Sequence, residues 1–188
     1  MDDAALIRGT LAGRRQDFEA LVERHQAALY AFVYRMVRDR EHTADIMQMT
    51  FLQAYAHLGQ FRGRASFKTW LHQIALNHCR ALFRSERAQR QVSLDDVNET
   101  SLEQAQARVA TGSAVAAGAE AGAGRRLMLE RLIARLPLRQ RAVVTLRIFS
   151  DLPFKEVARI EGISENSAKV NYHHAIVRLR QWLREEES

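Results

Sequence analysis

The sequence lacks the residue patterns that build disulfide frameworks and metal sites, and it has no long apolar stretch. Its single cysteine, Cys79, excludes an internal disulfide and any CxxC zinc or redox motif. Charged residues interrupt the apolar runs far short of the ~20 residues that cross a bilayer, and the opening MDDAALIRG has no apolar signal core. We therefore expect a cytoplasmic protein that uses no cofactor and holds no metal ion.

The chain is also poor in proline, with 2 among 188 residues, and no alternating strand pattern stands out. Apolar residues recur instead at spacings of three and four, which is typical of amphipathic helices. The predicted helices cover about 18–37, 42–58, 66–87, 125–136, 138–149, 154–161 and 165–186. This pattern predicts an all-α protein.

The segment between the third and fourth predicted helices has no such periodicity. It ends in ATGSAVAAGAEAGAG, an alanine and glycine tract that favours a flexible linker, although alanine would also permit a weakly stable helix over 102–120. We expect two small helical domains, over 1–90 and 125–188, joined by a flexible linker over 91–124.

Positive charge is concentrated in two blocks of the sequence. The whole chain carries +6, and residues 62–90 carry +6, residues 125–188 carry +5 and residues 91–124 carry −4. Two basic blocks on either side of an acidic connector suggest two contact points on one polyanion, because neutralised phosphates provide sequence-independent affinity. The alternative is two ordinary solvated surfaces.

The stretch PFKEVARIEGISENSAKVNYHH, residues 153–174, has the layout of a helix-turn-helix. Pro153 suits a first helical turn, Gly162 can supply the left-handed residue of a tight turn, and Ser164 can cap the next helix. A step of about 100° per residue divides that second helix into a core side and an outward side. The outward side and its edges carry the candidate contacts to DNA: Asn166, Lys169, Val170, Asn171, His173, His174 and Arg178.

These residue types suit a recognition helix in the major groove. Histidine and asparagine can bond base edges, Val170 can contact a thymine methyl, and Lys169 or Arg178 can reach phosphates. The two adjacent histidines could instead be a solvated surface. A zinc site is disfavoured because neighbouring side chains point apart and no further ligand follows at a suitable spacing.

The predicted helix over 66–87 has a second basic face. Phe67, Trp70, Leu71, Ile74, Ala75, His78 and Leu82 form one arc, and Lys68, His72, Gln73, Arg80, Arg84 and Arg87 form the other. The preceding LGQFRGRAS, residues 58–66, is a loop whose backbone can approach a ligand closely. A basic face beside such a loop suits single-stranded nucleic acid. The alternatives are that Phe61 and the other aromatic residues are plain core and that the cations are plain surface.

The stretch DIMQMTFLQ, residues 45–53, indicates a surface for a protein partner. The predicted inward stripe of its helix is Ala44, Met47, Phe51, Ala54, Tyr55 and Leu58. The predicted outward face is Asp45, Ile46, Gln48, Met49, Leu52 and Gln53. Apolar groups clustered on an outward face favour a protein partner, although the first helix of the same domain could also cover them.

Two ordered blocks, 45–84 and 136–183, resemble conserved regions 2 and 4 of the extracytoplasmic-function sigma factors, the small two-domain initiation subunits of bacterial RNA polymerase. The resemblance implies that region 2 docks its 45–53 face on the clamp helices of the β′ subunit and that region 4 reads the −35 element and touches the β flap. It also implies a −10 site that holds the non-template strand through Arg62, Arg64, Lys68, Asn77, Arg80 and Arg84.

The resemblance further implies that the acidic linker threads toward the polymerase active-site channel and that an anti-sigma factor, often membrane-anchored, holds the protein inactive. Two other functions stay open from the residues alone. The chain could be a stand-alone transcriptional regulator that uses only its helix-turn-helix. It could also be a nuclease with Asp95, Asp96 and Glu99 as metal ligands, although these acids have no supporting histidine or pocket.

Overall fold

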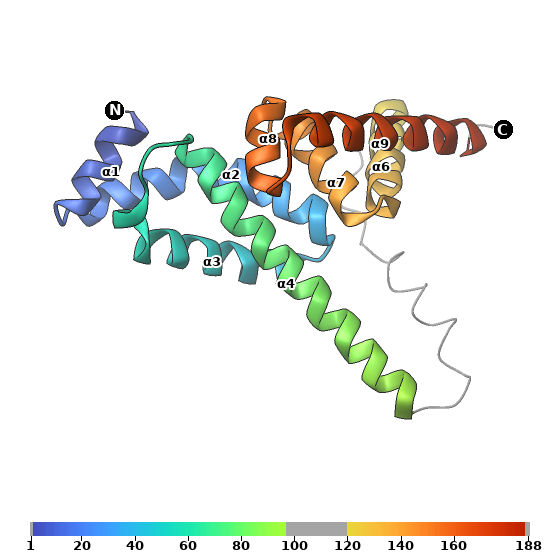
Figure 1. Cartoon of the computed structure of the whole chain (residues 1–188), viewed down its shortest axis with the longest axis horizontal. Coiled ribbons are helices and arrows are strands. Elements are labelled where there is room, and N and C mark those ends of the chain that lie inside the picture. Colours follow the sequence, from blue (N-terminus) through green and yellow to red (C-terminus); the bar gives the residue numbers. More distant parts are fainter. Residues whose placement is uncertain (1, 97–119, 187–188) are drawn as a thin grey trace.

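The computed structural model describes residues 2–96 and 120–186, and every regular element within these ranges is a helix (Figure 1). The elements are α1 (Asp3–Leu11), α2 (Arg15–Val37), α3 (Arg40–Ala56), η1 (Leu58–Gln60), α4 (Phe67–Asp96), α6 (Glu120–Arg135), α7 (Leu138–Val144), η2 (Thr145–Phe149), α8 (Phe154–Glu161) and α9 (Glu165–Glu186). The prediction of an all-α protein is confirmed. Among the described residues, no helix is both long enough and apolar enough to cross a membrane.

The helix boundaries follow local capping chemistry. Asp39 accepts a hydrogen bond from the His42 N–H at 2.8 Å and begins α3, and Ser66 accepts one from Thr69 at 3.0 Å and begins α4. Asp2 caps α1 in the same way, through the Ala5 N–H. Helix α1 lies outside the predicted set, because a helix of nine residues gives only a short apolar pattern.

Both ends of the predicted linker belong to helices. Helix α4 continues to Asp96, and α6 begins at Glu120 within the alanine and glycine tract. Asp95 and Asp96 therefore lie in the last turn of α4, whereas Glu99 and the suggested helix over 102–120 fall outside the described residues, apart from Glu120 itself.

The N-terminal half is a bundle in which α2, α3 and α4 pack around a common core (Figure 1). The inward face of α3 differs from the predicted one: Ile46 is only 2% exposed, whereas Ala44 and Tyr55 are exposed. Thr43 and Thr50 take inward positions on this helix, and both are fully buried. A search for apolar residues passes over these two threonines, and the predicted face is therefore rotated away from the observed one.

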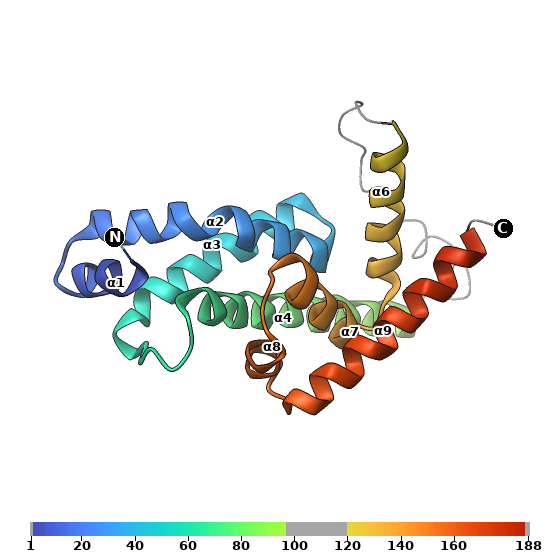
Figure 2. The ribbon, with the colours of Figure 1, turned by 90° about the horizontal axis from the view of Figure 1, so that it is seen from above.

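The C-terminal half packs against the N-terminal bundle. Helix α8 contacts α4 and η2 contacts α2 (Figure 2). One continuous apolar core runs from Leu6 of α1 to Ala168 of α9 and includes Leu146 and Val157. A second, smaller core joins α6, α7 and α9 around Leu132 and Leu179.

The carboxyl end of α2 is held by charged side chains of the C-terminal half. Arg141 of α7 is half-buried and donates to the Met36 carbonyl at 2.8 Å, which satisfies a backbone acceptor at the end of α2. Arg38 takes the left-handed conformation that ends the helix, with φ 60°, and donates to Glu130 of α6 at 2.9 Å. Glu130 also lies 3.9 Å from Arg35. These contacts fix α6 and α7 against α2.

His72 lies buried between α4 and the C-terminal half, although the sequence placed it on the outward basic arc. Its Nδ1 lies 2.8 Å from the Lys68 carbonyl, and its Nε2 lies 3.1 Å from the Ser150 hydroxyl. A carbonyl only accepts, so Nδ1 carries the proton and Nε2 of the neutral ring accepts from Ser150. Burial lowers the pKa of His72 to about 4, and nearby Lys68 and His25 add to that lowering.

Stability should therefore decrease in mild acid. The pKa of His72 is below its unfolded value of 6.5, so its stabilising contribution is complete above pH 6.5 and is lost as the pH falls toward about 4. Chemical denaturation of the wild type should show a free energy of unfolding that is about 2–3 kcal/mol lower at pH 4.5 than at pH 7.5 because of His72. The His72→Gln variant should lack this part of the decrease. An equal pH dependence in the two proteins would contradict this assignment.

Candidate nucleic-acid interface

Helices α8 and α9 form the predicted helix-turn-helix. Gly162 ends α8 with φ 68°, a left-handed conformation that favours glycine, and Ser164 accepts from the Ser167 N–H at 3.1 Å to cap α9. Ala158 and Ala168 are buried where the two helices meet, and their small side chains allow a close crossing. The helix-turn-helix interpretation is confirmed.

The outward face of α9 presents six of the seven predicted contacts to solvent. These are Asn166, Lys169, Val170, His173, His174 and Arg178. The seventh, Asn171, is half-buried, and its side-chain amide donates to the Ser167 carbonyl at 2.8 Å, within its own helix. Lys169 pairs with Glu165 at 2.8 Å, and Arg178 donates to Gln140 at 3.1 Å. Among the described residues, no group of three or more His, Cys, Asp or Glu side chains is placed to hold a metal ion.

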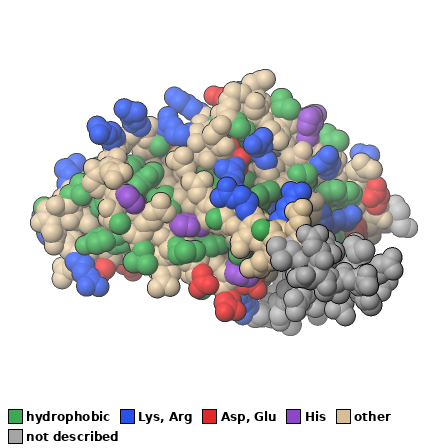
Figure 3. All heavy atoms as spheres, turned by 60° about the horizontal axis from the view of Figure 1, so that its bottom comes forward, with side chains coloured by type: hydrophobic (Ala, Val, Ile, Leu, Met, Phe, Trp, Pro, Cys, Tyr) green, Lys and Arg blue, Asp and Glu red, His purple; other side chains and the backbone are tan. Residues whose placement is uncertain are grey.

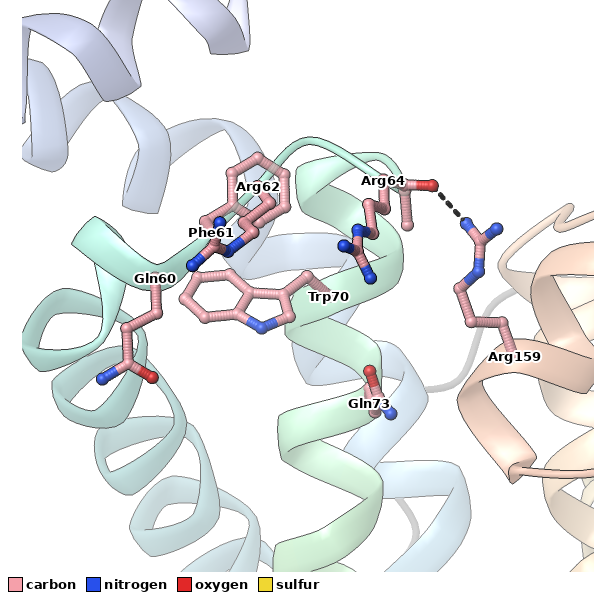
Figure 4. A pocket seen from close by; sticks show the side chains of 8 residues that line it. Gln60, Phe61, Arg62, Arg64, Trp70, Gln73 and Arg159 are labelled. Atoms are coloured by element: carbon pink, nitrogen blue, oxygen red, sulfur yellow. Dashed lines mark hydrogen bonds between the residues drawn. The ribbon is translucent and has the colours of Figure 1, made fainter.

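The loop before α4, the first two turns of that helix and Arg159 of α8 line a pocket of about 290 Å³ (Figure 4). Its lining residues are Gln60, Phe61, Arg62, Arg64, Ala65, Trp70, Gln73 and Arg159. The aromatic rings pack together: Phe61 is tilted against Trp70 with centroids 5.2 Å apart and meets Phe67 edge to face at 5.9 Å. Phe67 is core, whereas Phe61 and Trp70 are half-buried and offer flat apolar surface to the pocket. The pocket thus combines an aromatic platform with two exposed guanidinium groups, those of Arg62 and Arg64.

The six residues predicted to hold the −10 strand fall into two groups. Arg62, Arg64, Asn77 and Arg84 are exposed. Lys68 and Arg80 are not on a free face, because the ammonium group of Lys68 donates to the Ser150 carbonyl and Arg80 pairs with Glu161 at 2.6 Å. The outward basic arc of α4 is therefore interrupted where α8 and the turn before it pack on the helix.

Glu161, at the end of α8, was not singled out by the sequence. Its side chain is fully buried and lies 3.7 Å from Arg139 as well as beside Arg80. Burial raises the pKa of this carboxyl, although both arginines act in the opposite direction. A glutamate at the end of an amphipathic helix gives no sequence signal of such a role.

Five of the six residues predicted for the outward face of α3 are exposed in the structure. Asp45, Gln48, Met49, Leu52 and Gln53 are exposed, whereas Ile46 is core. Leu52 is 62% exposed, and the exposed ring of Tyr55 joins the same helix surface and lies 4.8 Å from Phe18. Figure 3 views the molecule from the side on which α3 lies and shows hydrophobic side chains open to solvent there.

A helical bundle with a cationic helix, packed against a helix-turn-helix, is typical of a DNA-binding protein. The family model of Sigma-70 region 2 matches residues 21–89, and that of Sigma-70 region 4 matches residues 126–179. The chain belongs to the extracytoplasmic-function sigma factors. It is therefore a subunit that confers promoter specificity on RNA polymerase and carries no catalysis of its own.

Similar proteins cover nearly the whole chain. The sigma factor SigM of Mycobacterium tuberculosis is 29% identical over 181 residues, which is 96% of this chain and 84% of that protein. The sigma factor CarQ of Myxococcus xanthus is 29% identical over 174 residues, or 92% of each chain. The sigma factor RpoE of Bartonella quintana, solved in complex with the anti-sigma factor NepR, shares the fold with a TM-score of 0.72 and 22% identity, over 90% of this chain and 98% of that one.

Proposed function

We propose that this sigma factor directs core RNA polymerase to its promoters by contacting DNA at two places. The helix-turn-helix reads the −35 element, and the loop before α4 together with α4 holds the −10 element. The proposed contact with the −35 element is supported by the two faces of α9. One face is buried and includes Ala168 and Ala175, and the other exposes Val170, His173 and His174 to solvent. This face offers a methyl-binding group and two ring nitrogens of each histidine to base edges.

The pocket beside α4 is proposed to receive an unstacked base of the non-template strand. Bases stack on aromatic side chains whatever their sequence, and cations beside the platform hold the phosphates. Trp70 and Phe61 offer the platform, and Arg62 and Arg64 offer the cations. Arg84 and Asn77 lie farther along α4 and extend the same track.

The exposed face of α3 is proposed to dock on the clamp helices of the polymerase β′ subunit. Met49 and Leu52 provide apolar surface among Asp45, Gln48 and Gln53, which matches the mixed composition of many protein interfaces. Ile46 is buried and plays no direct part in this proposal, whereas Tyr55 is added to it. Region 4 is proposed to touch the β flap.

We also propose that a membrane-associated anti-sigma factor controls this chain and that the chain acts as a cytoplasmic sigma factor. This proposal is supported by the solved relative that is bound to an anti-sigma factor. It adds no membrane-inserted part to this chain.

Run-off transcription with core RNA polymerase on fragmented genomic DNA tests the proposed function. Discrete transcripts that require this protein are expected, and their aligned upstream sequences define the −10 and −35 elements. Specific duplex binding by the protein alone, without polymerase-dependent transcripts, would indicate a stand-alone regulator instead.

The two histidines should affect sequence preference rather than general affinity. His173→Ala or His174→Ala in the holoenzyme should reduce discrimination at individual −35 positions by about 1–3 kcal/mol per lost base contact. Arg84→Ala should instead weaken binding to all promoters by a similar factor, because phosphate contacts carry no sequence information. Competition binding to a panel of promoters with single −35 changes measures the difference, and uniform losses for all three variants would contradict the assignment.

Leu52→Asp should weaken binding to core polymerase by at least about tenfold, because docking would bury an unpaired carboxylate. The matched control is Leu127→Asp on α6, which introduces the same charge at another exposed leucine. Titration of fluorescently labelled protein with core polymerase gives both affinities. Equal affinities for the two variants would remove α3 from the interface.

A further inference from the structure

Two adjacent histidines, His173 and His174, lie at the centre of the outward face of α9. A step of about 100° per residue places them, with Val170 and Val177, within an arc of about 100° around the helix. All four side chains are exposed. Helices α6, α7 and α8 pack on the other side of α9 (Figure 2). The face that we assign to the −35 element is therefore built around the two imidazole rings.

Neither histidine has a polar partner among residues 2–96 and 120–186. Within these ranges, no group donates to or accepts from either ring, and no carboxylate pairs with one. The rings meet only each other, with centroids 6.2 Å apart. His25, by contrast, lies 2.9 Å from the Asp3 carboxylate. The described part of the protein therefore fixes neither the tautomer nor the charge of the two rings on α9.

The cations at the two edges of this face are already engaged. The ammonium group of Lys169 lies 2.8 Å from Glu165, and Arg178 donates to Gln140 of α7 at 3.1 Å. The valines at the centre of the face cannot ionise. Positive charge at the centre therefore arises from the two histidines, when they take up protons.

The charged groups around α9 make no hydrogen bond or ion pair with either histidine. Glu161 of α8 pairs with Arg80, and Glu130 of α6 pairs with Arg38. The other described charged groups on the helices packed against α9 are Lys155, Glu156 and Arg159 of α8, Arg139 and Arg141 of α7, and Arg125, Arg126, Arg131 and Arg135 of α6. The remaining titratable groups of α9 itself are Tyr172, Arg180, Arg184, Glu185 and Glu186. The ligand, rather than a neighbouring helix, therefore decides the charge of the two rings.

The major groove of DNA offers acceptors to these rings in a negative environment. Guanine presents N7 and O6 there, adenine presents N7, and phosphates line both sides of the groove. A neutral imidazole has one N–H donor, whereas an imidazolium ion has two. Histidine changes its charge close to neutral pH, and negative charge nearby favours the protonated form. Docking against purine edges therefore favours the uptake of a proton by each ring.

We propose that His173 and His174 bind the −35 element as imidazolium ions, each of which donates to an acceptor on a purine edge. The proposal rests on the assignment of α9 to the −35 element. The two side chains point about 100° apart, so they meet different base pairs. Their centroid separation of 6.2 Å corresponds to about two base-pair steps of ~3.4 Å. Recognition therefore takes up protons and requires purines at two positions about two base pairs apart.

Proton uptake is tested by the affinity of the holoenzyme for a promoter found by run-off transcription, measured at pH 8.0 and 6.0 and constant salt. The complex binds more protons than its free components, so affinity should rise as the pH falls. The rise should be at least about fivefold larger in the wild type than in His173→Gln/His174→Gln, because glutamine keeps a donor and an acceptor but takes up no proton. His42→Gln, at an exposed histidine of α3, is the control and should keep the wild-type pH dependence. Equal pH dependence of the wild type and the double variant would overturn the proposal.

The purine contacts are tested with promoters in which 7-deazaguanine or 7-deazaadenine replaces one −35 purine at a time. Such a base keeps its pairing edge but loses the N7 acceptor that the major groove presents. At pH 6.0 the wild-type holoenzyme should lose affinity by at least about fivefold at the two contacted positions, and by less at pH 8.0. The His173→Gln/His174→Gln holoenzyme should not show this dependence on pH. Tolerance of the replacement at every −35 purine would also overturn the proposal.

Alanine variants separate failure of this inference from failure of the proposed function. If His173→Ala reduces discrimination at a −35 position while the wild type and the glutamine double variant share one pH dependence, α9 reads the element and the imidazolium proposal is wrong. If His173→Ala, His174→Ala and Val170→Ala all leave discrimination among −35 sequences unchanged, the −35 assignment itself is wrong, and the inference fails with it.

Discussion

The packing of the C-terminal half on α4 joins the two halves of the molecule and sets which cations of α4 face solvent. Helix α4 contributes Leu71 and Leu76 to the N-terminal core, and it also meets α8 and Ser150 in the turn before α8. His72 illustrates the constraint, because it is buried as a neutral ring between the Lys68 carbonyl and the Ser150 hydroxyl. One helix thus serves the core of the bundle, the contact between the halves and the cationic DNA surface.

Charged side chains join the two halves at two places, the carboxyl end of α2 and the middle of α4. At the end of α2, Arg141 satisfies a backbone carbonyl and Arg38 meets Glu130, and apolar packing lies beside both. At α4, Arg80 meets a carboxylate that keeps one oxygen unpaired. Each contact leaves a buried polar atom without a partner, Nε of Arg141 in the first and Oε1 of Glu161 in the second. A buried ion pair stabilises only when its remaining bonding capacity is filled, so neither contact is held by charge alone.

Helix boundaries and the helix-turn-helix were predictable because their causes are local. Capping by Ser66 and Ser164 and the left-handed turn at Gly162 depend on residues within one helical turn. The inward face of α3 was not predictable, because Thr43 and Thr50 have polar side chains and yet are fully buried. The exposed side of α9 was predictable because the apolar stripe of that helix is continuous. The exposed side of α4 was not predictable, because α4 carries apolar or basic residues on nearly all of its sides.

Local sequence patterns were enough to predict the helices other than α1, the caps at Ser66 and Ser164, and the residues that can meet DNA, because helix periodicity and turn chemistry depend on a few neighbouring positions. Which of those residues are accessible depends on contacts between residues far apart in the chain. Arg80 and Glu161 are 81 positions apart, and His72 and Ser150 are 78 apart. Whether such distant groups meet depends on how two apolar surfaces pack, and no local pattern of charge or hydropathy records that outcome.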